Sequence, residues 1–172
     1  KLLVNCYQPI VDHWSYQTMK FDLGDQLTSD ASKGGSDAGD RSQITEVGRG
    51  NPLATNSMFT DLWNHRYKVA ISACNVLLAQ VTPDKQLIQA GGSLVPEQTK
   101  LRWIAEGHFM RAFYYYDLAT IFQNIPIIDK PLNVIDKSTI TKASKEEVMA
   151  FILSDLDKAI AEPNLPSAKK LP

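Results

Sequence analysis

The sequence predicts a mainly α-helical protein: TPR-like antiparallel helical hairpins forming an α-α superhelix, with a long glycine-rich loop. Apolar residues recur every three or four positions along several segments, and none shows the period-two alternation of a half-buried strand. Trp63 and Trp103 lie roughly one helical-hairpin repeat apart. Five of the nine glycines gather between Thr28 and Pro52, where the apolar periodicity stops. These three observations predict the fold class.

The first half of the chain contains two predicted helices separated by that loop. Large apolar side chains approximate one face over residues 3–21, and Gly24 closes this segment. A loop as long as the one that follows is usually functional or disordered. The helix predicted over 59–81 has the clearest amphipathic stripe of the sequence, and Asn56 or Ser57 can cap it.

The second half opens with a short predicted helix. Thr82 and Pro83 are typical of a helix start, and Gly91 ends the segment. Pro96 begins the next long helix, whose residues 101–122 are apolar almost all round. We therefore expect this helix to be buried on several sides.

The 101–122 helix is expected to be the most buried and to pack antiparallel against the 59–81 helix. The side chains expected at that contact are Trp63, Tyr67, Phe109 and Ala112. Three consecutive tyrosines follow, and the helical period allows at most one of them to face solvent. After a short extended stretch, Ser144 and Glu147 predict a capping box for the last helix, which Pro163 ends.

Composition excludes several classes of function. The 172 residues carry a formal net charge of -1 without a basic block, which argues against binding nucleic acid or an anionic membrane. The longest apolar run is far shorter than the roughly 20 residues that span a bilayer. Cys6 and Cys74 lack the CxxC or Cys/His spacing of a metal site.

Motifs of catalysis and metal binding are absent. The three histidines, His13, His65 and His108, lack the HExxH spacing of a zinc site. We interpret His65 as half of a solvated pair with Asp61, and His108 as a hydrogen-bonded core histidine. Neither GxSxG nor GxxxxGK[ST] occurs, so we expect no catalytic residue and no cofactor.

Acidic residues of the loop leave two alternatives open. Asp30, Asp37 and Asp40 could bind calcium, although Lys33 intervenes and the EF-hand pattern is not met, so we expect no metal. The same acids are the only clustered loop carboxylates that a glycoside hydrolase could use, since that chemistry needs two carboxylates across a cleft.

Three blocks of residues resemble the SusD/RagB family of Bacteroidetes outer-membrane lipoproteins. The strongest resembles EAxFLRAxxYFxLVxxFGxVP and consists of Glu106, Gly107, His108, Phe109, Met110, Arg111, Ala112, Tyr115, Tyr116, Leu118, Phe122 and Pro126. A block similar to WxxxYxxIxxxN precedes it, at Trp63, Tyr67, Ile71 and Asn75. A block similar to SxxEVxxxIxxDLxxA follows it, at Ser144, Glu147, Val148, Ile152, Asp155, Leu156 and Ala159.

This resemblance implies a non-enzymatic subunit that binds an oligo- or polysaccharide and caps a SusC-like TonB-dependent transporter. It implies a surface-exposed lipoprotein of the cell outer membrane, held there only by an N-terminal lipid anchor that is absent from this chain. Residues 1–172 would form the N-terminal TPR-like region of a longer, truncated protein, and we expect an exposed apolar patch on it. The alternative function is a TPR-like adaptor that binds a protein partner.

The glycine-rich loop is our candidate for ligand or partner contact. Its glycines relax the backbone, and its charged side chains of both signs suit a neutral ligand better than a polyanion. The residues proposed for this contact are Asp30, Lys33, Asp37, Asp40 and Arg41. The alternative is a solvated connector.

Overall fold

The computed structural model describes residues 1–12, 19–28, 30–37, 39–89, 91–133 and 137–165. Over these residues the secondary structure is helical, with two isolated antiparallel β-bridges and no strand. The chain divides into two compact units, Gln8–Val69 on one side and Lys1–Tyr7 with Ala70–Pro172 on the other. The predicted mainly helical fold class is confirmed.

The N-terminal segment differs from the single helix predicted over 3–21. It contains α1 (Leu2–Val11) and α2 (Met19–Gly24), and Asp12 lies outside both. Gly24 ends α2, as predicted. His13 lies outside the described residues.

The predicted long loop is interrupted by the helix α3 (Ser42–Gly48), so the expectation of an unbroken loop was wrong. Ile44 and Val47, three positions apart, are buried on one side of α3. This short apolar face is the physical reason for the helix. Before α3, the structure describes residues 30–37 and 39–41 as loop.

The helix predicted over 59–81 is present as three consecutive helical elements: α4 (Ser57–Asn64), the π-helical segment η2 (His65–Ile71) and α5 (Ser72–Gln80). Asn56 caps α4, as predicted, because its Oδ1 accepts a hydrogen bond from the backbone N–H of Met58 at 3.0 Å. The π-helical segment was not predicted, since the spacing of apolar residues in this region fits an ordinary α-helix as well.

The short helix predicted after Pro83 is absent, and this segment is instead a turn followed by a narrow hairpin. Lys100 Nζ donates to the backbone carbonyls of Pro83 and Lys85, so a side chain satisfies these groups instead of helical N–H groups. The hairpin that follows contains the bridge between Ile88 and Leu94. Gly91 and Gly92 form its turn with φ angles of 107° and 83°, in the region that favours glycine.

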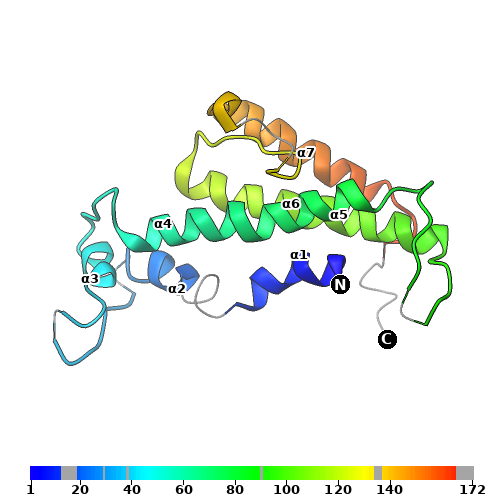
Figure 1. Ribbon diagram of the computed structural model, residues 1–172. Helices are drawn as coiled ribbons and strands as arrows, with labels where there is room; N and C mark the ends of the chain where they lie inside the picture. The colour runs from blue at the N-terminus through cyan, green and yellow to red at the C-terminus, as the bar shows by residue number, and fades with distance from the viewer. Residues whose placement is uncertain (13–18, 29, 38, 90, 134–136, 166–172) are drawn as a thin grey trace. The chain divides into compact units, whose positions relative to one another are not determined.

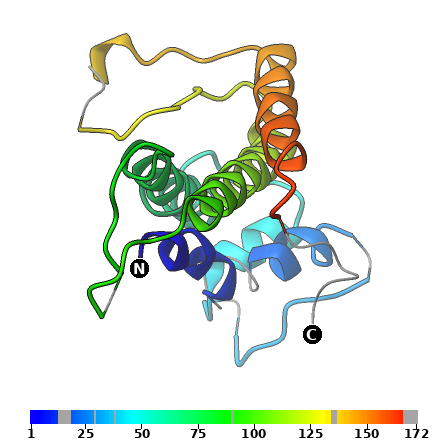
Figure 2. The same cartoon turned by 90° about the vertical axis from the view of Figure 1, so that its right-hand side faces the viewer.

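The unit that includes Ala70–Pro172 is organised around α6 (Glu97–Phe122), which lies between α5 and α7 (Lys145–Ile160) and is antiparallel to both (Figure 1). Figure 2 shows the packed pair α6 and α7 from another side. Of the helices described, α6 contains the most buried residues, which confirms its predicted central position.

Two features of α6 show where the packing prediction holds and where it fails. Ala112 is 1% exposed, as expected, but Phe109 is 46% exposed and does not belong to the core. Phe109 and Tyr116 are seven residues apart and lie on the outward face of the helix, whereas Tyr114 and Tyr115 are fully buried. Contact of this helix with Trp63 and Tyr67 remains a prediction, because they belong to the other unit.

Gly107 allows α5 and α6 to approach closely. A Cβ atom at this position would lie 2.8 Å from Leu77 Cδ2 and 3.3 Å from Leu78 Cδ2. Both distances are shorter than ordinary carbon contacts. A small residue is therefore required at position 107 if the two helices are to keep this separation.

The last helix begins with the capping box that the sequence predicts. Ser144 Oγ accepts a hydrogen bond from the Glu147 N–H at 3.2 Å, and Glu147 Oε2 accepts one from the Ser144 N–H at 2.7 Å. On its outer side, Leu153 and Ile160 are exposed and, like the exposed pair on α6, stand seven residues apart. Among the described residues, no helix is long and apolar enough to cross a membrane.

Candidate ligand-binding site

The five residues proposed from sequence lie in and at the end of the segment that joins α2 to α3. Asp30, Asp37, Asp40 and Arg41 are exposed, and Lys33 is half-buried. The structure brings Lys33, Asp37 and Asp40 together at the tip of the loop. Asp30 is separate from this group, with its backbone N–H donating to Thr28 Oγ1 at 3.2 Å.

Asp37 organises the loop tip through its carboxylate. Its Oδ1 accepts hydrogen bonds from the backbone N–H groups of Gly39, at 2.7 Å, and Asp40, at 3.0 Å. Lys33 Nζ donates to the Asp37 carbonyl oxygen at 3.3 Å. Asp37 therefore shapes the turn, a common role for aspartate in loops.

Gly35 accommodates the carboxylate of Asp40. Its φ of 123° favours glycine, and a Cβ atom there would lie 2.5 Å from Asp40 Oδ2. Asp40 thus folds back over the backbone of the loop. The two aspartates therefore fix the conformation of the tip, which is a polar surface with charged groups of both signs close together.

Arg41 faces away from the tip, towards α2. It has a left-handed φ of 50° at the N-terminus of α3, and its Nη2 lies 3.7 Å from Asp22 Oδ2. Asp22 is buried, and this burial raises the pKa of its carboxyl group while Arg41 opposes the shift. Arg41 therefore has a structural contact within the unit.

A second polar cluster lies in the other unit, where it is built from residues of the three sequence blocks. Arg111 Nε and Nη2 donate to the two oxygens of Asp155 at 2.7 and 2.9 Å. His108 Nδ1 lies 2.8 Å from Asp155 Oδ1. The Arg111 guanidinium also lies over the Phe151 ring, 5.1 Å from its centroid. Asp155 and Arg111 are buried, so this is an ion pair of the core.

The protonation of Asp155 is set by this cluster. Burial on its own would raise the pKa of the carboxyl group. Hydrogen bonds from His108 and Arg111, together with the positive charge of Arg111, outweigh burial and leave the pKa below its ordinary value. Asp155 is therefore a carboxylate that the guanidinium and the imidazole stabilise.

The same cluster holds the connector that follows α6. Arg111 Nη1 donates to Asn75 Oδ1 at 2.8 Å and to the Asp129 carbonyl at 3.0 Å. Asn75 Nδ2 donates to the carbonyls of Ile128, at 2.8 Å, and Lys130, at 3.1 Å. These side chains satisfy backbone groups of residues 128–130, which follow the isolated bridge between Pro126 and Lys142.

Tyr115 also holds this connector. We call the four residues Asn75, Arg111, Tyr115 and Asp155 the clamp. The Tyr115 hydroxyl donates to the Ile128 carbonyl at 3.1 Å and accepts from the Ile128 N–H at 2.6 Å. Burial raises the pKa of Tyr115 well above its ordinary value, so the hydroxyl keeps its proton. The most characteristic residues of the sequence blocks therefore have a structural role.

His65, in the other unit, has a neighbour that the sequence did not suggest. Its Nδ1 lies 2.9 Å from Arg66 Nη1. Burial, followed by the positive charge of Arg66, lowers the pKa of this imidazole. The neutral form of His65 can accept a hydrogen bond from the guanidinium.

A concavity of about 390 Å³, lined by both polar and apolar side chains, opens beside the clamp. His108, Arg111, Asp129 and Lys130 contribute its charged and titratable groups, and Leu78 and Ile104 are among its apolar ones. Its size is within the range of small-molecule sites. This concavity could not be inferred from the sequence, because its lining comes from three separate segments of the chain.

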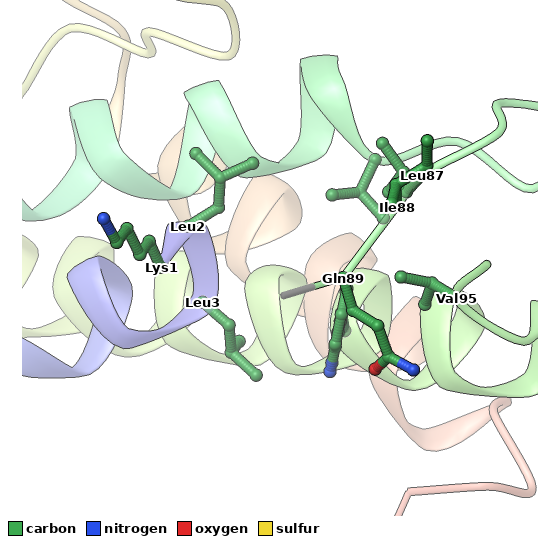
Figure 3. A pocket seen from close by; sticks show the side chains of 9 residues that line it. Lys1, Leu2, Leu3, Leu87, Ile88, Gln89 and Val95 are labelled. Carbon is green, nitrogen blue, oxygen red and sulfur yellow. The ribbon is translucent and has the colours of Figure 1, made fainter. Parts of the chain in front are cut away.

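An apolar pocket of about 410 Å³ lies at the start of α1. Figure 3 shows Leu2 and Leu3 on one side and Leu87, Ile88 and Val95, from the hairpin region, on the other. This lining offers few partners for sugar hydroxyls. Within the described part of the chain, no group of three or more His, Cys, Asp or Glu residues could hold a metal ion.

Comparison with known proteins identifies relatives of this chain. A family model for SusD-like proteins, described as starch-binding and associating with the outer membrane, matches residues 2–168. SusD-like protein P2 of Formosa agariphila is 28% identical over 140 residues, which are 80% of this chain and 23% of that protein.

Solved structures share the fold. Surface glycan-binding protein A from Bacteroides fluxus is 27% identical, with a TM-score of 0.73 over 94% of this chain and 32% of its own. Surface glycan-binding protein A from Bacteroides uniformis is 21% identical, with a TM-score of 0.76 over 96% of this chain and 34% of its own. The chain thus spans about a quarter to a third of the length of these relatives.

Proposed function

Since this chain belongs to the SusD-like family, we propose that it is the N-terminal helical region of a non-enzymatic, glycan-binding subunit of an outer-membrane uptake complex. The observation that carries this proposal is the family match over residues 2–168, whose description combines starch binding with the outer membrane. The surface glycan-binding protein from Bacteroides fluxus, with the same fold, supports it.

The proposed partner is a SusC-like TonB-dependent transporter, which the glycan-loaded protein would cap. The proposed location is the cell surface, where the whole protein would be a lipoprotein of the outer membrane. The family description supports association with that membrane. Neither proposal requires a spanning helix in this chain.

The proposed ligand is an uncharged oligo- or polysaccharide, contacted in part by the loop over residues 30–41. Lys33, Asp37 and Asp40 place donors and acceptors close together on an exposed loop tip, which suits sugar hydroxyls that both donate and accept. Loops fixed on a rigid scaffold commonly carry binding residues.

A non-catalytic role agrees with the contacts of the acidic side chains. Asp37 uses its carboxylate to hold two backbone N–H groups, and Asp155 is a buried ion-pair partner of Arg111. A glycosidase needs one carboxylic acid and one carboxylate facing the scissile bond. These two aspartates have structural functions instead.

The test uses the full-length protein and gels that contain starch, other neutral polysaccharides or an acidic polysaccharide. We expect slower migration in at least one neutral gel, no new reducing ends after long incubation, and copurification of a TonB-dependent transporter from the native membrane. Migration unaffected by every polysaccharide, together with specific capture of a peptide, would favour the adaptor alternative. New reducing ends would establish a hydrolase.

The loop is tested by a triple variant, Asp30→Ala, Lys33→Ala and Asp40→Ala, which leaves the hydrogen bonds of the Asp37 carboxylate to the backbone and the contact of Arg41 with Asp22 in place. We expect at least a tenfold weaker affinity for the glycan or the transporter and little change in melting temperature, because exposed charges contribute at most about 1 kcal/mol each. The matched control is Asp61→Ala with Lys68→Ala, at exposed positions outside the loop. Equal affinities of the triple variant and the parent would make the loop a connector.

A further inference from the structure

The concavity beside the clamp lies within one of the two compact units. Its lining comes from residues 75–83, which include the end of α5, from residues 104–111 of α6 and from residues 129–131 of the connector. Asn75 and Arg111, from the two helices, hold this connector by hydrogen bonds to its backbone. The walls of the concavity are therefore fixed by contacts of the core.

Arg111 contributes a buried hydrogen-bond donor to the lining. A guanidinium carries five N–H groups, and four of those on Arg111 donate to Asp155, Asn75 and the Asp129 carbonyl. Among the described residues, none accepts a hydrogen bond from the fifth, which is on Nη2. Buried donors normally have an acceptor, and the Arg111 side chain is only 5% exposed. An oxygen atom of a bound ligand would supply that acceptor.

His108 contributes a second polar group to the lining. Its Nδ1 lies 2.8 Å from Asp155 Oδ1, and because Asp155 is a carboxylate, this nitrogen donates the hydrogen bond. The other ring nitrogen, Nε2, makes no hydrogen bond within the part of the chain that the structure describes. It accepts a hydrogen bond in the neutral ring and donates one in the charged ring. A hydroxyl group can pair with either form, because it both donates and accepts.

The fixed charges around the concavity cancel one another. Asp129 and Lys130 are exposed neighbours of opposite sign in the lining. The positive charge of Arg111 is neutralised by its ion pair with Asp155. The site therefore has no excess charge that would attract an anion or a cation. An uncharged ligand with several hydroxyl groups suits it better than an ion.

We propose that this concavity binds a neutral mono- or disaccharide unit and so forms a glycan contact in addition to the loop. That the ligand is a sugar rests on the proposed function, whereas its small size and lack of charge follow from the concavity itself. The volume of about 390 Å³ lies near the lower end of small-molecule sites, which range from roughly 300 to 1,000 Å³. Leu78, Ile104 and Pro131 supply apolar wall for the C–H groups of a sugar ring.

Each polar group of the lining has a partner on such a ligand. One sugar hydroxyl accepts the hydrogen bond of Arg111 Nη2, and another pairs with His108 Nε2. The exposed Asp129 carboxylate accepts from hydroxyl groups, and Lys130 Nζ donates to them. The side chains of Asp129 and Lys130 can be removed without breaking the clamp, because its hydrogen bonds to these residues use their backbone carbonyls.

The experiment uses the full-length protein and a double variant, Asp129→Ala with Lys130→Ala, which keeps the net charge. Saturation-transfer NMR and calorimetry measure the binding of glucose, galactose, mannose, xylose, maltose and cellobiose, with glucuronate as a charged probe. We expect the parent to bind at least one neutral sugar more tightly than glucuronate. The double variant should bind that sugar at least about fivefold more weakly, because it lacks two hydrogen-bonding groups. Its melting temperature should stay within about 2 °C of the parent's, since both side chains are exposed.

Chemical modification of histidines locates the bound sugar. Diethyl pyrocarbonate modifies imidazole nitrogens, and peptide mass spectrometry measures the extent of reaction at each histidine. A saturating concentration of the sugar should slow the reaction at His108 and leave it unchanged at His65, which lies outside the concavity.

The matched control is Lys145→Ala with Glu146→Ala. It removes an exposed neighbouring pair of opposite charge that does not line the concavity, and it should bind the sugar like the parent. Failure of every neutral sugar in this set to bind, or tighter binding of glucuronate, would overturn the proposal. Equal affinities of the double variant and the parent, or an unchanged reaction at His108, would overturn it too.

The polysaccharide gels and the triple variant of the loop, run on the same preparations, separate this inference from the proposed function. A protein that a polysaccharide retards, but whose binding of short sugars depends on the loop and not on Asp129 and Lys130, would overturn the concavity as a sugar site and leave the proposed function in place. Binding of a short sugar that the double variant loses, in a protein that no polysaccharide retards and that copurifies with no transporter, would overturn the proposed function alone.

Discussion

Replacement of Asp155 by asparagine is expected to destabilise the protein strongly at neutral pH. The change keeps the shape of the side chain but removes a charge that accepts hydrogen bonds from Arg111 and lies against His108. Asparagine also places an N–H donor against one of these neighbours. Removing one partner of a buried ion pair costs about 3–5 kcal/mol, because the other charge remains buried. We expect this loss in the free energy of unfolding.

The pH dependence gives this prediction a second test. The folded-state pKa of Asp155 is lowered, so its stabilising contribution is complete above the unfolded pKa of about 3.9 and is lost as the pH falls through the folded value. The stability difference between the parent and Asp155→Asn should therefore narrow below about pH 4.

Urea unfolding followed by circular dichroism at pH 7 and pH 3 measures both effects. Asp157→Asn is the matched control, because Asp157 is exposed on the same helix and should change stability by less than about 0.5 kcal/mol. A loss below about 1 kcal/mol for Asp155→Asn at pH 7, or a difference that is equal at both pH values, would refute the assigned role of the ion pair.

Two further substitutions test the packing of α6. Tyr115→Phe should lower the free energy of unfolding by about 1–3 kcal/mol and speed amide hydrogen exchange at Ile128, because it leaves buried backbone groups unpaired. Tyr116→Phe, at a position 55% exposed, should change neither quantity. Similar exchange rates in the two variants would contradict the role of Tyr115 in the clamp. Ala112→Leu should cost about 1–3 kcal/mol by overpacking, and a melting temperature equal to that of the parent would show that the site is not closely packed.

Local signals in the sequence were sufficient to predict the long helices. Three of these signals affect only the residues next to them, and the structure contains all three: the capping box at Ser144, the cap at Asn56 and the proline before α6. The apolar residues all round α6 correctly predicted its burial. Helix ends and helix burial follow from neighbouring residues, so the sequence shows them.

Elements were mispredicted where the sequence signal is weak or fits two kinds of structure equally well. The helix α3 presents only two buried apolar residues, too few to form a recognisable stripe in the sequence. Thr82 and Pro83 are equally suitable for a turn, and the amine of Lys100, which comes from another element, selects the turn. The distinction depends on a contact between segments distant in sequence.

The loop that we propose as a ligand contact could be located from the sequence, but its internal contacts could not. Composition indicated the loop, and Lys33, Asp37 and Asp40 do lie together. The contact of Arg41 with Asp22 could not be inferred, because it depends on where α2 is placed. Composition can indicate polar groups, but it does not tell which of them already have partners inside the protein.

The clamp around Arg111 bears on how related proteins can differ in what they bind. Its groups point inward to one another and to the backbone of residues 128–130, so the residues by which the family is recognised are occupied with holding a connector. The loop residues that we propose for ligand contact make none of these hydrogen bonds. Under the proposed function, specificity for a sugar and stability of the scaffold are therefore separable traits, and a match to these motifs carries no information on which glycan is bound.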